Sequence, residues 1–333
     1  MPPAVLDAMT AFRGELDRQM ESQGHRMAGA WLTAVRGLDG EMEALARELS
    51  DRAARGLPVR RWDIVRQERY QALAAQMRTQ VRQFATVAER ETAEAQRLMG
   101  RWGVQQSQTL IDVAGGGVQL LGQFDRLPLD AFTRMVGNTG AGTPLGTLLR
   151  TLPGDSVTGM TNALVQGMAL GWHPTRTAES MRAGASIGLE RAILISRTES
   201  MRVFRAASQE QYRASNIVTK YRRVAAKSPR TCMSCLMLDG RMYDLAEDMF
   251  DHPAGRCVAV PVTGDDYRRE EWVTGEQWFR GQPEATQRSM MGPGRFAAWR
   301  AGQFDLPDLV TIQDDPIWGK SPAVTALARL GMR

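Results

Sequence analysis

The sequence predicts a mainly α-helical protein with a small α+β unit that a zinc ion stabilises. This prediction rests on two observations. Apolar residues recur every three or four positions over most of the first hundred residues, which is the pattern of long amphipathic helices. All three cysteines of the 333-residue chain, and one of its three histidines, lie within residues 230–257, between short segments rich in β-branched residues.

The N-terminal part of the chain predicts two or three long helices. Their apolar stripes run from Val5 to Leu49 and from Trp62 to Val87, and the Gly and Pro of residues 55–63 interrupt the pattern between them. A long helix seldom buries an apolar stripe of this length by itself, so we expect a helical hairpin or an association with the helices of a partner. Residues 1–110 are therefore interpreted as an N-terminal amphipathic helical arm.

The middle of the chain predicts shorter helices separated by glycine-rich joints. These joints are residues 114–118 and 137–146, where glycines cluster. A further helical stretch is expected from about residue 175 to residue 215. Together these features make residues 111–215 a central helical body.

Three short segments after residue 215 have the composition of strands. They are residues 216–226, 239–245 and 256–263, and the second follows an Asp-Gly turn. They define a small α+β unit, residues 216–264. The rest of the chain, residues 265–333, is expected to return to helix and loop as an aromatic-rich C-terminal extension.

Composition and charge exclude several classes of protein. Hydrophobic residues make up 43% of the chain and charged residues 24%, which excludes a wholly disordered or collagen-like chain. We find no secretory signal and no stretch apolar enough for a membrane helix, so we expect reduced cysteines and a cytoplasmic start. Residues 171–230 contain twelve Lys or Arg against four Glu, which indicates a phosphate-bearing or acidic partner.

The cysteines and the histidine have the spacing of zinc ligands. Two residues separate Cys232 from Cys235, and four separate His252 from Cys257. Two such turns can direct three thiolates and one imidazole at a single ion, a closed set typical of structural zinc sites. The metal would contribute on the order of 10 kcal/mol to the folding of a unit with a small core. Alternatively, the cysteines are buried apolar residues and His252 lies at the surface.

No catalytic constellation is visible in the sequence, and we expect the protein not to be an enzyme. The cluster lacks the His-x-Glu of zinc deaminases, and its CxxC runs into a turn rather than starting a helix as in thioredoxin-like proteins. The glycines of residues 137–146 lack the Lys of a phosphate loop. A zinc-dependent nuclease or another DNA-processing enzyme remains the alternative.

Two further groups of charged residues are candidates for function. A basic cluster beside the cysteines, suited to non-specific contact with DNA phosphates, consists of Lys220, Arg222, Arg223, Lys227 and Arg230. The alternative is a solvated face that pairs with acidic neighbours such as Glu247 and Asp248. Arg197 and Glu199 are expected to form a structural ion pair or cap that holds their helix against the small sheet.

In combination these motifs resemble the minor head protein, or head morphogenesis, family of tailed bacteriophages, the Mu F-like group. That family has Arg-Thr-Glu on a helix, then CxxC, Asp-Gly, and His-Pro before a Cys-Arg-Cys. The matching residues here are Arg197, Thr198, Glu199, Cys232, Cys235, Asp239, Gly240, His252, Pro253, Arg256 and Cys257. Gly255 replaces the first cysteine of Cys-Arg-Cys, so one candidate ligand is absent. The resemblance covers residues 165–310, roughly.

The resemblance implies a virion component present in few copies and needed for infectious particles. Such a protein lies in the head interior near the portal and associates with the portal protein, with scaffold or major capsid protein as further candidate partners. It would contact packaged DNA, would not meet a membrane, and would occupy the host cytoplasm before assembly.

Overall fold

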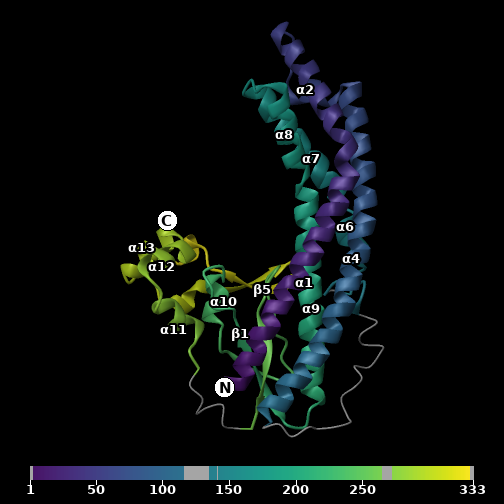
Figure 1. The fold of residues 1–333 in the computed structure, drawn as a ribbon. Helices are drawn as coiled ribbons and strands as arrows, with labels where there is room; N and C mark the ends of the chain where they lie inside the picture. The colour runs from purple at the N-terminus through teal and green to yellow at the C-terminus, as the bar shows by residue number, and fades with distance from the viewer. Residues whose placement is uncertain (1–2, 116–134, 141, 265–271, 331–333) are drawn as a thin grey trace. The chain divides into compact units, whose positions relative to one another are not determined.

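The computed structural model describes residues 3–115, 135–140, 142–264 and 272–330 (Figure 1). Within these ranges the chain is mainly helical, which confirms the predicted class, and its strands form one three-stranded and one two-stranded sheet. The chain divides into two compact units. Unit 1 comprises residues 1–17, 96–142 and 198–333, and unit 2 comprises residues 18–95 and 143–197. The four consecutive segments inferred from the sequence are a different partition and stay a prediction.

The N-terminal helices follow the predicted apolar stripes. Helix α1 (Pro3–Val35) is joined to α2 (Asp39–Ala54) by the 3-10 turn η1 (Arg36–Leu38), and the expected break follows before α3 (Arg61–Val65). Helix α4 (Glu68–Ala114) is longer than the stripe predicted. None of the helices in the described ranges combines the length and the apolar character needed to cross a membrane.

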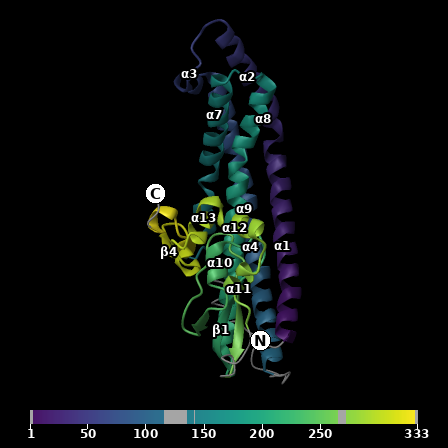
Figure 2. The ribbon, with the colours of Figure 1, turned by 90° about the vertical axis from the view of Figure 1, so that its left-hand side faces the viewer.

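Unit 2 also contains α6 (Leu145–Leu149), α7 (Leu152–Ala169) and α8 (Pro174–Ala185). Helices α7 and α8 lie side by side in Figure 2. They approach closely because both have glycine at the crossing: a Cβ on Gly159 would lie 2.0 Å from the carbonyl oxygen of Gly184. The glycine content of the middle segment therefore serves helix packing as well as joints.

Unit 1 contains the three-stranded sheet. Its strands β1 (Val218–Val224), β2 (Met242–Asp244) and β3 (Val258–Thr263) confirm the three predicted segments and pair antiparallel in the order β2-β1-β3. Helix α9 (Ile187–Ala214) reaches this sheet through its C-terminal half, where the hydroxyl of Tyr212 donates to the carbonyl of Ala259 at 3.0 Å. The small sheet is thus attached to a long helix.

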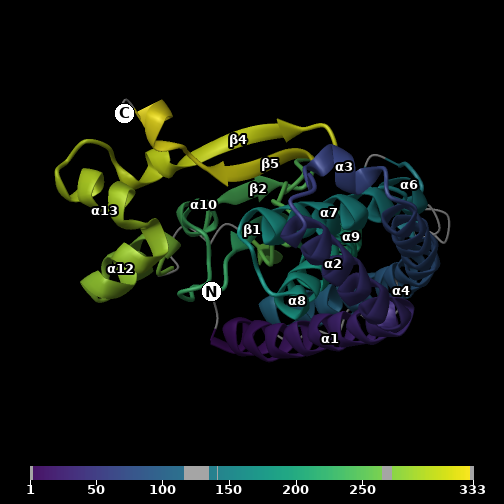
Figure 3. The same cartoon turned by 90° about the horizontal axis from the view of Figure 1, so that it is seen from above.

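The C-terminal extension is more structured than the sequence indicated. It contains α11 (Gly275–Arg280), α12 (Glu284–Met291), α13 (Pro293–Arg300), η3 (Leu306–Leu309) and η4 (Leu327–Leu330). It also contains a hairpin of β4 (Val310–Asp315) and β5 (Gly319–Val324), visible in Figure 3, where helix and loop were expected. Two features of the sequence agree with this hairpin: the alternation of apolar and polar residues in Val310–Ile312, and a glycine at the turn. The glycine, Gly319, has the positive φ that such a turn needs.

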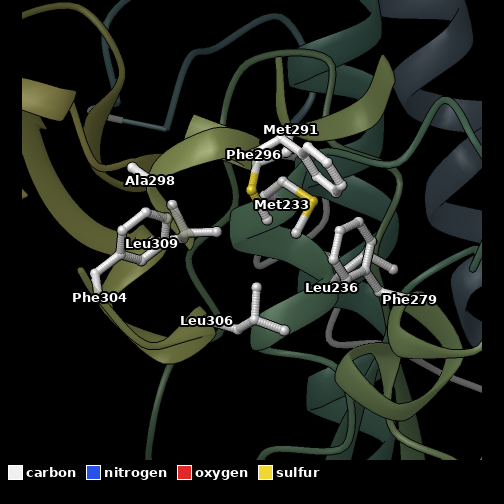
Figure 4. Packing of buried hydrophobic residues seen from close by; sticks show 9 residues of the cluster. All are labelled: Met233, Leu236, Phe279, Met291, Phe296, Ala298, Phe304, Leu306 and Leu309. Carbon is white, nitrogen blue, oxygen red and sulfur yellow. The ribbon is translucent and has the colours of Figure 1, made fainter. Parts of the chain in front are cut away.

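The extension shares a core with α10 (Met233–Met237), the short helix that begins after the first cysteine. The buried members of this cluster, shown in Figure 4, are Met233, Leu236, Phe279, Met291, Phe296, Ala298, Phe304, Leu306 and Leu309. The sequence analysis expected the small unit to bury little apolar surface of its own. In agreement, most of the buried side chains of this cluster belong to the C-terminal extension and not to the small unit.

Candidate metal centre

The CxxC motif lies at the start of the short helix α10, although a turn was expected here rather than the start of a helix. The two faces of this helix have different roles. Cys232 is the N-cap residue, and its sulfur accepts from the backbone N–H of Cys235 at 3.4 Å. Met233 and Leu236, one position further on, point into the apolar cluster of Figure 4. Because residues three apart share a helix face, one face of α10 presents thiols while the other is anchored in the core.

His252 is held opposite these thiols by the histidine loop, which is the segment between β2 and β3 (residues 245–257). Its Nε2 lies 3.3 Å from the sulfurs of both Cys232 and Cys235. Its Nδ1 lies 2.9 Å from the carbonyl oxygen of Pro253, so Nδ1 donates there and Nε2 faces the sulfurs. This is the orientation that metal-binding histidines receive from an outer hydrogen bond.

Cys257 approaches the same centre from the start of β3. The ligand atoms of Cys232, Cys235 and His252 lie within 4.8 Å of one another, and Cys235 belongs to a second such group with Asp251 and Cys257. All three cysteines and the histidine line one cavity of about 100 Å³. The structure therefore brings the four predicted ligands together, with Cys235 between the others.

Hydrogen bonds within the cluster shift the pKa values of its members. Hydrogen bonds from Cys235 and from His252 lower the pKa of Cys232 to about 4, although burial alone would raise it. The hydrogen bond to Cys232 raises the pKa of His252 to about 9. Hydrogen bonds to Cys232 and Cys257 raise the pKa of Cys235, while the bond from Cys235 lowers the pKa of Cys257. Cys235 therefore holds its proton more tightly than Cys232 or Cys257.

The donor set fits a soft divalent metal. Three sulfurs and one imidazole nitrogen line one cavity, and thiolate and imidazole ligands suit zinc rather than magnesium or calcium. The cluster of Cys232, Cys235 and His252 could therefore hold a metal ion.

Asp251 anchors the histidine loop through two arginines. Its carboxylate lies 3.1 Å from Nη1 of Arg205 on α9 and 2.7 Å from Nη2 of Arg223 on β1. These two guanidinium groups hold the pKa of Asp251 below its usual value, against the opposing effect of burial. Arg205 also donates to the carbonyls of Gly255 and Cys257 at 3.2 and 3.3 Å. The sequence analysis missed both Arg205 and Asp251 as site residues, because nothing in their spacing links them.

The carboxylate of Asp251 also explains the glycine at position 255. A Cβ on Gly255 would lie 2.2 Å from Oδ2 of Asp251 and 2.3 Å from its Cγ. Any larger side chain at position 255 would displace the carboxylate. A cysteine there, as in the Cys-Arg-Cys of the family that the sequence resembles, is incompatible with Asp251 in this position.

The Arg-Thr-Glu motif on α9 connects to the same loop. The hydroxyl of Thr198 accepts from the backbone N–H of Ala254 at 2.9 Å, which supports a residue with φ of +56°. Glu199 is buried and forms its ion pair with Arg202, Nε to Oε2 at 2.7 Å. The ion pair of Glu199 is therefore with Arg202 and not with Arg197, which corrects the expected pairing. The motif does hold the helix to the histidine loop, but through Thr198.

The Asp-Gly motif connects the strands to the extension. The Asp239 carboxylate accepts from the backbone N–H of Ala225 at 2.7 Å and from the indole N–H of Trp272 at 3.2 Å. Lys227 pairs with the same carboxylate at 3.0 Å. Gly240 has φ of +88°, and a Cβ there would lie 2.7 Å from the indole nitrogen of Trp272. The motif has a structural role.

The five basic residues proposed for DNA contact do not form one surface. Arg223 is fully buried and Arg222 is 4% exposed, beneath the extension, with its guanidinium 4.9 Å from the ring centre of Trp272. Lys220 pairs with Asp244 and Lys227 with Asp239, whereas Arg230 is exposed. Because phosphate contacts need an accessible cation, a DNA contact here would involve Lys220, Lys227 and Arg230 only.

Comparison with known protein families points to the class of phage head-related proteins. Residues 158–260 match the model of the family described as Phage Mu protein F like protein, which confirms the resemblance seen in the sequence. The matched range begins in α7, ends in β3, and includes the candidate metal ligands. No curated protein and no solved structure gives a significant match to the chain.

Proposed function

We propose that this chain is a minor head, or head morphogenesis, protein of a tailed bacteriophage. In this proposal it is a low-copy structural component that associates with the portal inside the procapsid and supports the assembly of infectious particles. The observation that supports it is the family match over residues 158–260. That range contains α9 and the histidine loop, the two parts that hold the candidate metal centre together.

We also propose that the centre binds zinc through Cys232, Cys235, His252 and Cys257. Bound zinc would supply four ligand bonds that tie α10, the histidine loop and the start of β3 to one point. A closed set of three thiolates and an imidazole has no vacant position for a reacting water, so its role is structural and the protein is not an enzyme. The orientation of His252 by Pro253 supports this assignment.

Assembly of the head can be tested by reconstitution. The full chain would be co-expressed with the portal, scaffold and major capsid proteins of the phage genome that encodes it, and procapsids would be purified. We expect a few copies of the chain per procapsid and retention of the portal protein on a tagged chain. Absence from procapsids, together with no retention of portal protein, would contradict the proposal.

The same purified chain discriminates against the enzymatic alternative. Incubation with plasmid DNA and zinc should give no cleavage. Cleavage that disappears in a His252→Ala variant while the fold is retained would support a zinc-dependent nuclease instead. Non-specific DNA binding should weaken steeply with salt, by about one unit of log–log slope for each phosphate neutralised. A Lys220→Ala, Lys227→Ala, Arg230→Ala variant should reduce that slope.

A further inference from the structure

Three buried charged side chains lie beside the four proposed zinc ligands. The side chains of Asp251 and Arg223 are 0% exposed and that of Arg205 is 8% exposed. They come from the histidine loop, β1 and α9, so the fold brings together three charges that are distant in sequence. Burial of a charge is costly unless a partner compensates it, and the three as a group carry one net positive charge.

This group lies against the sulfur of Cys235. Nη2 of Arg223 is 3.5 Å from Sγ of Cys235, and Oδ1 of Asp251 is 3.8 Å from the same sulfur. The backbone N–H of His252 donates to Oδ1 of Asp251 at 3.1 Å. One carboxylate therefore connects a thiol ligand, the backbone of the imidazole ligand and two guanidinium groups.

The charges of the proposed centre and of this group cancel. A divalent ion bound by three thiolates and a neutral imidazole has one net negative charge. Two arginines and one aspartate have one net positive charge. Arg13, which is half-buried and also lies near Cys257, has the buried carboxylate of Asp239 as its own counter-charge and is left out of this sum. In a buried environment, where charges are weakly screened, a neutral total is much less costly than a charged one.

We propose that Asp251, Arg205 and Arg223 form the outer coordination sphere of the metal centre and are matched in charge to a divalent ion held by three thiolates. The three are positioning residues. Arg223 compensates the thiolates, while Asp251 keeps the two guanidinium groups in place and fixes the histidine loop. This inference deepens, and rests on, the zinc site proposed above.

The test is a comparison of zinc affinities in the full-length chain, measured by competition with a chromophoric chelator. Loss of an outer-sphere residue typically weakens metal binding about 10- to 100-fold. We expect Arg223→Met to lose affinity by that factor, since it leaves an uncompensated negative charge. The double variant Asp251→Asn, Arg223→Met restores the balance and should bind zinc at least about tenfold more tightly than Arg223→Met alone.

Asp248→Asn is the matched control. Asp248 lies three positions from Asp251 but is exposed and pairs with Arg213 at 3.2 Å. Its substitution should leave zinc affinity unchanged. Arg223→Lys retains the charge and should bind zinc nearly as well as the original chain, which keeps the test decisive if Arg223→Met fails to fold.

The possible failures are distinguishable. A wild-type chain that binds no zinc would refute the metal site itself, and this inference with it. A chain that binds zinc, but whose double variant binds no more tightly than Arg223→Met, would refute charge matching alone. In that case the three residues would act through packing, and the losses of zinc affinity from the two substitutions would add. A tenfold loss in Arg223→Lys would also overturn the inference.

Discussion

Substitution of Gly255 by alanine tests the packing of the histidine loop. The added Cβ would lie 2.2 to 2.6 Å from three atoms of the Asp251 carboxyl group, and ordinary contact begins at 3.4 Å. The carboxyl group must therefore move by about 1 Å, and a hydrogen bond of ordinary length does not survive such a shift. Asp251 cannot turn toward solvent, because its side chain is 0% exposed and bound to Arg205 and Arg223.

The size of the effect follows from what the shift breaks. Loss of one partner from a buried ion pair costs about 3–5 kcal/mol, and overpacking without loss of a pair costs about 1–3 kcal/mol. Since the shift cannot preserve both ion pairs, we expect Gly255→Ala to lower the free energy of unfolding by about 3 kcal/mol. Zinc affinity should fall as well, because His252 follows Asp251 directly.

Denaturant unfolding of the full-length chain, followed by fluorescence, measures this cost. Gly281→Ala is the control, since Gly281 is exposed, and a Cβ there would lie 3.5 Å from the nearest atom. It should change stability by less than about 1 kcal/mol. The reasoning is refuted if Gly255→Ala unfolds within about 1 kcal/mol of the original chain, because the carboxylate would then have room to move.

Three further predictions concern parts of unit 1. Removal of metal with a chelator should lower the melting temperature, because a ligand that binds the folded state stabilises it; an unchanged melting temperature would argue against a structural ion. Leu236 is fully buried in the cluster of Figure 4, and Leu236→Ala should lower the free energy of unfolding by about 2–5 kcal/mol, as measured with denaturant. Leu32 is 62% exposed, and Leu32→Ala should change that free energy little. Gly103→Ala should also destabilise the chain, since its Cβ would lie 2.5 Å from the backbone oxygen of Phe204 and two helices would have to separate; a melting curve that matches the original would exclude this close approach.

The helices and the three strands of the first sheet could be predicted from the sequence because each depends on a local pattern of residues. The ligand spacing could be read directly from the positions of the cysteines and the histidine. The stripes that begin at Val5 and Trp62 became α1 to α4, and the three β-branched segments became β1 to β3. The hairpin of β4 and β5 was missed because half of its strand residues are polar and because β5 contains Pro322, a residue uncommon within strands. A two-stranded hairpin is specified by the core beside it rather than by its own sequence alone.

The basic cluster shows the limit of reasoning from composition. Lys220 and Arg223 look alike in a sequence of charges, yet on β1 the side chain of Lys220 is partly exposed and that of Arg223 is fully buried against Asp251. Only the pairing of β1 between β2 and β3, and its contact with the histidine loop, decides which side chain meets solvent.

The sequence by itself determined that this chain is mainly helical, that three cysteines and one histidine have zinc-ligand spacing, and that it resembles the Mu F-like group. Each of these follows from residue type and separation along the chain. The tertiary structure alone decided that Asp251, Arg205 and Arg223 form one buried ion-pair group beside Cys235, and that Gly255 leaves room for the carboxylate. Those contacts join a loop, a strand and a helix, and no local pattern specifies where such elements meet.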